Sequence, residues 1–212
     1  MEVVGKSQAL VTLESCLQDS SIYFSDHEKI IKCNPYCKNV SYLTELDIFQ
    51  WTFEVEDPRN NPIVAIFFVK QTEELVPAGS DTLIKFTEQN TNGVAPDLNQ
   101  PGRKIRWRSA ETIPELTIEN NHTFIGQSDS DIFLHHQEDN RTAVHFETQI
   151  SLDFTLSFPL NLMPENFLKY MSEKIMSSIM QQATESMLCK VQADICCTEP
   201  DIKAEGGTHC NS

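Results

Sequence analysis

The chain has 212 residues, and 31 Asp and Glu outweigh 16 Lys and Arg to give a formal net charge of -15. This charge excludes general binding to nucleic acid or to anionic membrane surfaces, because the phosphate groups of both would repel the protein. The length suits one large domain, and no apolar run approaches the roughly 20 residues of a membrane-spanning helix. We therefore expect no stable membrane insertion.

The N-terminus lacks the long apolar region and small-residue cleavage site of a secretory signal, so we expect a cytoplasmic protein. In that compartment the seven cysteines would be reduced thiols.

The part of the chain before residue 137 predicts short elements. Ser25 and Glu28 have the spacing of a capping box that begins a short helix, and Asn34-Pro35 would end that helix. The parity of the apolar residues changes near Ile48, which indicates a bulge or turn. In chain order we predict a strand at 8–16, the helix at 25–31, a strand or hairpin at 40–55, a turn at 56–62, and further strands at 63–69, 81–86, 104–108, 115–119, 122–125 and 131–136.

The strongest pattern is an alternation of apolar and polar residues over residues 142–158. From residue 144 to residue 158, seven of the eight residues of one parity are apolar, whereas His145, Glu147 and Asp153 lie on the polar parity. This predicts a long strand of an antiparallel sheet that is covered on one face only. A turn at 138–141 precedes the strand.

The C-terminal region predicts one long helix. Pro164 suits a first helical turn, and neither Pro nor Gly follows it before residue 196. Apolar residues recur at spacings of three and four, which indicates an amphipathic helix over 164–195 with a broad apolar side. Residues 198–212 have little apolar content, and we expect them to be a disordered tail.

One strand, a short helix, a meander of about six strands and a long helix together predict an α+β fold, a curved antiparallel β-sheet wrapped around the C-terminal helix. This order resembles the START-like, or SRPBCC, superfamily, which has the helix-grip fold. The resemblance rests on residues 25–35, on the strand entry at 40–51 with Trp51, and on the segments 142–158 and 164–195. The spacing is also similar to that of uncharacterised cyanobacterial and plastid members. We expect residues 1–197 to form a single domain of this type.

The resemblance implies a cavity between sheet and helix, which in relatives holds lipids, sterols, quinones, polyketides or other hydrophobic small molecules. A broad, Met-rich helix against a curved sheet can leave such a space. The alternative is that the inward side chains fill a dense core. The inward residues expected to bind the ligand are Trp51, Phe67, Trp107, Phe146, Ile150, Phe154, Met171, Ile175 and Ile179.

Other chemistry has weaker support in the sequence. Cys33 with Cys37 and the adjacent pair His135 and His136 lack the spacing of a zinc site, and adjacent histidines on a strand point to opposite faces. We therefore predict no metal and no cofactor.

No acid–base pair is visible either, and no catalytic residue is assigned. Thr148 is the only polar residue on the inward parity of the long strand, and the direction of His122 is undecided. Glu45 or Asp47 would face inward only if the bulge shifts the parity. No nucleophile elbow or phosphate-binding glycine loop occurs.

The densest basic spot lies on the predicted strand 104–108. It could contact an acidic protein partner or an anionic head group, or pair across the sheet with acidic neighbours such as Glu115 and Glu119. The spot comprises Arg103, Lys104, Arg106 and Arg108.

We predict that the chain binds or transports a hydrophobic small molecule or lipid by burying it between sheet and helix. The alternatives are a cyclase- or hydrolase-type enzyme that uses the same cavity, and a protein-interaction or assembly factor without a ligand. An inward acid–base pair would favour the enzyme, a continuous apolar pocket the carrier, and a filled interior beside an exposed apolar patch the interaction factor.

Overall fold

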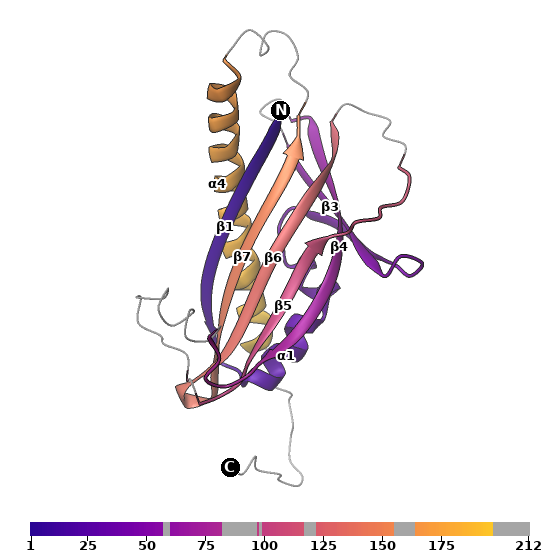
Figure 1. Cartoon of the computed structure of the whole chain (residues 1–212). Helices are drawn as coiled ribbons and strands as arrows, with labels where there is room; N and C mark the ends of the chain where they lie inside the picture. The colour runs from indigo at the N-terminus through magenta and orange to yellow at the C-terminus, as the bar shows by residue number, and fades with distance from the viewer. Residues whose placement is uncertain (57–59, 82–96, 98, 117–121, 155–163, 197–212) are drawn as a thin grey trace.

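The computed structural model describes residues 1–56, 60–81, 97, 99–116, 122–154 and 164–196, and these residues form one sheet with three α-helices (Figure 1). The seven strands lie in the order β1-β7-β6-β5-β4-β3-β2. In chain order the elements are β1 (Glu2–Leu13), α1 (Leu17–Ser25), α2 (His27–Lys32), β2 (Cys37–Leu43), β3 (Ile48–Glu56), β4 (Pro62–Val76), β5 (Gly102–Ser109), β6 (Thr123–Gln137), the 3-10 turn η1 (Glu138–Asn140), β7 (Arg141–Asp153) and α4 (Glu165–Cys196).

Consecutive strands in this order are antiparallel, and the sheet curves around the helices, so the predicted fold class is confirmed. The exception is a short parallel pairing between β4 and β6, where Val64 to Phe67 lie opposite Thr123 to Gly126. β5 is much shorter than β4 and β6, and β6 pairs directly with β4 beyond the end of β5. The sheet therefore narrows at that end.

Several predicted strands are longer than expected. β4 continues past Val69 through a polar stretch to Val76, because that stretch pairs with the basic residues of β5. The segments 122–125 and 131–136 are parts of one strand, β6. The predicted strand 81–86, apart from its first residue, much of the strand 115–119 and the tail 198–212 lie outside the described residues.

β7 confirms the predicted long strand as far as Asp153. The face of β7 that was predicted to be exposed is, however, buried at one end. Glu147 and Gln149 are exposed as expected, whereas His145 is only 7% exposed. His145 packs beside Phe133 on the convex face, with ring centroids 6.2 Å apart, so this part of the sheet is buried on both faces.

Two helices stand where one was expected. Asp26, not Ser25, caps α2, because its side chain accepts the backbone N–H of Lys29 at 3.1 Å. Ser25 ends α1, and its hydroxyl donates to Glu73 on β4 at 2.9 Å. The preceding helix α1 has no strong apolar stripe, and two of its buried residues are serines, so the hydrophobic pattern did not reveal it.

The long C-terminal helix is confirmed as α4, and its closest strand is β1 at the edge of the sheet. Polar side chains of α4 form hydrogen bonds with backbone N–H and C=O groups of this edge strand. The side chain of Gln181 accepts the N–H of Gln8 at 3.2 Å and donates to its carbonyl at 2.9 Å, and Gln192 donates to the carbonyl of Thr12 at 3.0 Å. These bonds occupy groups that an unprotected edge would offer to another strand.

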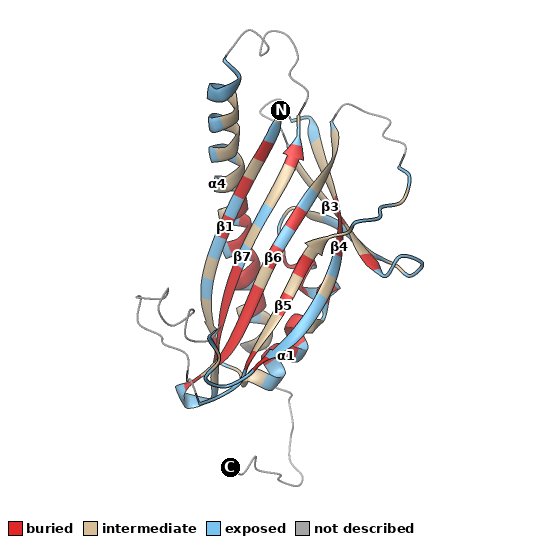
Figure 2. Cartoon of the chain, viewed as in Figure 1, coloured by how far each residue is buried: buried red, intermediate tan, exposed pale blue. Residues whose placement is uncertain are grey.

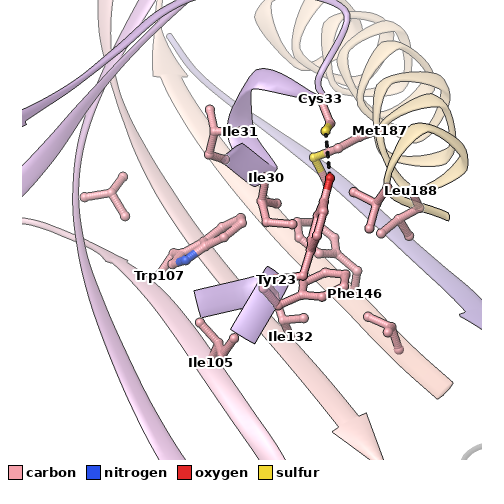
Figure 3. Close-up of a cluster of buried hydrophobic side chains, with 14 of the residues drawn as sticks. Tyr23, Ile30, Ile31, Cys33, Ile105, Trp107, Ile132, Phe146, Met187 and Leu188 are labelled. Carbon is pink, nitrogen blue, oxygen red and sulfur yellow. Dashed lines mark hydrogen bonds between the residues drawn. The ribbon is translucent and has the colours of Figure 1, made fainter. Parts of the chain in front are cut away.

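The core lies where α1, α2 and the C-terminal half of α4 meet the concave face of the sheet. Burial along α4 is uneven: Met187 and Val191 are buried, whereas the first turns, with Phe167 and Tyr170, are exposed (Figure 2). None of the helices in the described residues is long and apolar enough to cross a membrane. The core side chains labelled in Figure 3 are Tyr23, Ile30, Ile31, Cys33, Ile105, Trp107, Ile132, Phe146, Met187 and Leu188.

Candidate ligand cavity

A cavity of about 460 Å³ lies between the concave face of the sheet and α4. Six strands and the inward side of α4 contribute to its wall, together with residues that follow α2. Most lining side chains are apolar, and the volume falls within the range of pockets that bind small molecules. Helix α2 contributes Ile31 to the wall, and the α4 residues on the wall are Ser172, Ile175, Met176, Ile179, Met180, Ala183, Thr184 and Met187.

The structure places eight of the nine predicted ligand contacts on this wall. Met171 is the exception: it is 41% exposed and does not line the cavity, because it belongs to the exposed first turns of α4. The position of the other eight residues on the wall does not by itself show that they contact a ligand, and that contact stays a prediction. The eight are Trp51, Phe67, Trp107, Phe146, Ile150, Phe154, Ile175 and Ile179.

Both tryptophans are held in place by a buried polar network. Trp51 donates its indole N–H to Nε2 of His27 at 2.7 Å, and Trp107 donates to Oε1 of Gln71 at 2.7 Å. The same Gln71 oxygen lies 2.6 Å from Nδ1 of His27, so Nδ1 carries the imidazole proton and donates it. The indole N–H groups thus have protein partners, and the rings remain as apolar surface for the cavity.

His27 itself is held neutral. Burial lowers its pKa to about 4, since a charged imidazole would lose its hydration there. Its ring stacks on Phe49 with centroids 3.8 Å apart. A neutral ring is also what the network requires, because only an unprotonated Nε2 can accept the Trp51 N–H.

The polar part of the wall consists mainly of hydroxyl groups. The hydroxyls of Ser130 and Thr148 lie 2.7 Å apart, and that of Thr184 lies 2.8 Å from Ser7. Ser128 is 1% exposed, and its hydroxyl has no hydrogen-bond partner among the described residues. None of the side chains that the structure places on the wall is charged. The α-amino group of Met1 lies at one end, where it donates to the carbonyl of Phe154 at 2.9 Å.

Ser128 and Ser130 were missed because residues 126–131 resemble a polar turn. The signal that could have found them is parity. Ser128 and Ser130 share the parity of Ile132 and Leu134, both of which are completely buried. A strand extended backwards from residue 131 would have pointed both serines into the cavity.

The candidate catalytic side chains lie away from the cavity. Glu45, Asp47 and His122 are exposed, and Asp47 pairs with Lys70 at 3.1 Å. Thr148, the polar residue on the inward parity of the long strand, does line the wall.

Two of the candidate metal ligands, Cys33 and His135, make other contacts. Cys33 lies between Tyr23 and Asp194, and Nε2 of His135 is 3.0 Å from Nε2 of His145 (Figure 3 shows the Tyr23 contact). Burial raises the pKa of the Cys33 thiol, which disfavours the thiolate that binds metals. Within the described part of the chain, no three His, Cys, Asp or Glu residues are arranged to hold a metal ion.

The basic residues of β5 pair with acids across the sheet. Arg108 binds both carboxylate oxygens of Asp131, at 2.8 and 2.9 Å, and Lys104 lies 3.4 Å from the same residue. Arg106 pairs with Glu74 at 2.7 Å and Arg103 with Glu73 at 3.9 Å. Among the described residues, the paired acids thus come from β4 and β6; Glu119, one of the two acids suggested by the sequence, lies outside the described residues. Contact of this strand with a protein partner stays a prediction.

Comparison with known proteins identifies the fold. No family model and no curated protein matches the sequence. Among solved structures, the Zhui aromatase/cyclase from Streptomyces sp. R1128 is similar over 95% of this chain and 99% of its own, with a TM-score of 0.51 and 9% identity. TTHA0849 from Thermus thermophilus covers 92% of this chain and 99% of its own, with a TM-score of 0.50 and 11% identity.

A START superfamily protein from Mycobacterium smegmatis also matches, with a TM-score of 0.45 and 10% identity over 90% of this chain and 96% of its own. At such identities these likenesses concern the fold alone. The chain has the helix-grip fold that the sequence resemblance implied. The narrower similarity to cyanobacterial and plastid members stays a prediction.

Proposed function

We propose that this protein binds a hydrophobic small molecule or lipid in the cavity and carries it shielded from water. The observation that carries the proposal is a space of about 460 Å³ with an apolar wall that, among the described residues, contains no charged side chain. Burial of apolar ligand surface there would contribute about 25 cal/mol for each Å² removed from water.

The composition of the wall favours a carrier over an enzyme. A cyclase or hydrolase would need groups that transfer protons in the cavity. The described wall offers hydroxyls, the amide of Asn34 and the phenol of Tyr36, but no carboxylate, imidazole, thiol or lysine side chain. An open interior likewise favours a carrier over an interaction factor with a filled core.

Ligand entry is proposed at the N-terminal end of α4. Ile175 lines the cavity and is nevertheless 57% exposed, so the wall reaches the surface at this point. Phe167 and Tyr170, one or two turns earlier, are exposed as well. Movement of these turns, which lack the burial of the rest of the helix, would open the cavity and close it again.

The first test is native mass spectrometry of the purified protein, with organic extraction of whatever co-purifies. It is followed by titration with lipid, sterol, quinone and fatty-alcohol panels. Both tryptophans of the chain line the cavity, so quenching of intrinsic fluorescence reports binding directly. If no class binds, the proposal fails.

A matched pair of variants links binding to the cavity. Ala183 lies on the wall, and Ala183→Phe should fill part of the space and weaken binding at least tenfold. Ala193 is exposed on the same helix, so Ala193→Phe should bind as the wild type does. Unchanged binding by a folded Ala183→Phe protein would place the ligand elsewhere.

A further inference from the structure

We infer that the ligand is an uncharged molecule with one hydroxyl or carbonyl group, which hydrogen-bonds to Ser128 while the remaining apolar part fills the cavity. The inference rests on the proposed function and assigns its ligand class. It depends on a single side chain that lines the cavity and whose buried hydroxyl has no hydrogen-bond partner in the described structure.

The backbone around Ser128 is firmly held. The hydroxyl of Ser109 accepts the N–H of Ser128 at 2.7 Å and donates to its carbonyl at 3.1 Å. Ser109 thus forms hydrogen bonds with the backbone N–H and C=O of Ser128 but not with the Ser128 hydroxyl. Buried hydroxyls normally find a partner, because leaving one unpaired is unfavourable. A polar atom of a ligand would remove this cost.

Two neighbouring hydroxyls enlarge the polar spot. Ser130 follows Ser128 on the same face of β6, roughly 7 Å along the strand, and pairs in the sheet with Thr148. The hydroxyl of Ser130 donates a hydrogen bond to that of Thr148, so within this pair the O–H of Thr148 has no acceptor. The spot can therefore both donate to and accept from one small polar group.

The described wall has no charged side chain, which disfavours an ionised ligand. The lining side chains that the structure describes include no cation to pair with a carboxylate or phosphate, and burying an unpaired ion is far more costly than burying a hydroxyl. The amino group of Met1 is remote from the spot. Ile150 is opposite Ser128 in the sheet, and Phe154, next to Met1, is four residues or roughly 13 Å further along.

The size and shape of the space restrict the ligand further. At about 30 Å³ for each solvent-sized unit, the cavity of about 460 Å³ holds roughly 15 non-hydrogen atoms. Aromatic rings adjoin the polar spot: Trp107 is opposite Ser130 in the sheet, and its ring centroid lies 5.7 Å from that of Phe146. A compact ring system with one polar substituent fits this surface.

Three probes with the same three-ring skeleton test the inference: phenanthrene, 9-phenanthrol and phenanthrene-9-carboxylate, titrated against tryptophan fluorescence. We expect 9-phenanthrol to bind about three- to tenfold more tightly than phenanthrene, as one hydrogen bond allows. The carboxylate should bind at least tenfold more weakly than 9-phenanthrol. Equal affinities for phenanthrene and 9-phenanthrol, or tightest binding by the carboxylate, would overturn the inference.

Variants assign the preference to Ser128. In Ser128→Ala the preference for 9-phenanthrol should disappear, and in Ser128→Thr, which keeps the hydroxyl, it should persist. Ser20 gives a matched control, because it is also completely buried with an unpartnered hydroxyl but lies in α1, away from the wall. Ser20→Ala should keep the wild-type preference, and loss of the preference there, or its survival in Ser128→Ala, contradicts the assignment.

The two proposals fail in different ways. If phenanthrene and 9-phenanthrol bind equally and Ala183→Phe abolishes both, the cavity is a binding site but Ser128 does not select the ligand. If neither these probes nor the lipid, sterol and quinone panels bind, the proposed function fails, and the inference fails with it.

Discussion

Lowering the pH from 7 to 5 should destabilise this protein through His27, the imidazole that links α2 to the two cavity tryptophans. Its ordinary pKa is 6.5, and burial lowers the pKa to about 4 in the folded protein. Between these values the unfolded chain binds a proton that the folded chain does not. The free energy of unfolding therefore falls as the pH falls below 6.5, and this contribution vanishes at higher pH, where both states are neutral.

The size of the effect follows from the shift. Each pH unit between the two pKa values costs about 1.4 kcal/mol, so pH 5, which is 1.5 units below the ordinary value, costs roughly 2 kcal/mol. The physical cause is the loss of hydration and of the Nε2 acceptor that holds Trp51. His135 and His145, buried on the convex face, have lowered pKa values through burial and act in the same direction.

Urea unfolding at pH 7 and pH 5, followed by tryptophan fluorescence, measures the effect. His27→Gln removes the titrating group and should lose about 2 kcal/mol less than the wild type between the two pH values. An equal loss in His27→Gln and in the wild type would refute the reasoning.

Four further substitutions test the packing by urea unfolding. Ile132→Ala, in the completely buried core, should cost about 3 kcal/mol, and Ile150→Ala, beside the open cavity, only about 1 kcal/mol; equal costs would contradict the cavity. Gly126→Ala should cost about 1–3 kcal/mol, because its Cβ would lie 2.8 Å from the carbonyl oxygen of Ser151, and a neutral result would contradict the close approach. Gln181→Ala should cost about 1 kcal/mol and speed amide exchange in β1; unaltered exchange would show that α4 does not protect this edge.

The main elements of the fold could be predicted from local pattern. The apolar–polar alternation that predicted β7 and the apolar stripe that predicted α4 are each properties of a single segment, and the structure contains both elements. The helix α1 could not be predicted in this way. Its buried Ser20 and Ser21 give no apolar stripe, and their burial depends on strands that are distant in the sequence.

Long-range pairing explains the errors as well. His145 was placed on an exposed face because one strand shows only its own alternation, whereas in the structure its ring lies beside those of Phe133 and His135 on the neighbouring strand. The partners of the β5 cations likewise come from the register of the sheet, which places Glu74 opposite Lys104 and Asp131 opposite Arg106. No spacing within one segment contains this information.

By itself the sequence determined the order of elements, the antiparallel sheet and its long covering helix, because hydrophobic periodicity records which side of each element avoids water. It also placed eight residues correctly on the inward side, but could not decide between a filled core and a lined cavity. That depends on the distance between sheet and helix, which tertiary contacts set by anchoring α4 to the edge of β1. Only the tertiary structure revealed that Ser128 lines this space and that its hydroxyl has no partner among the described residues.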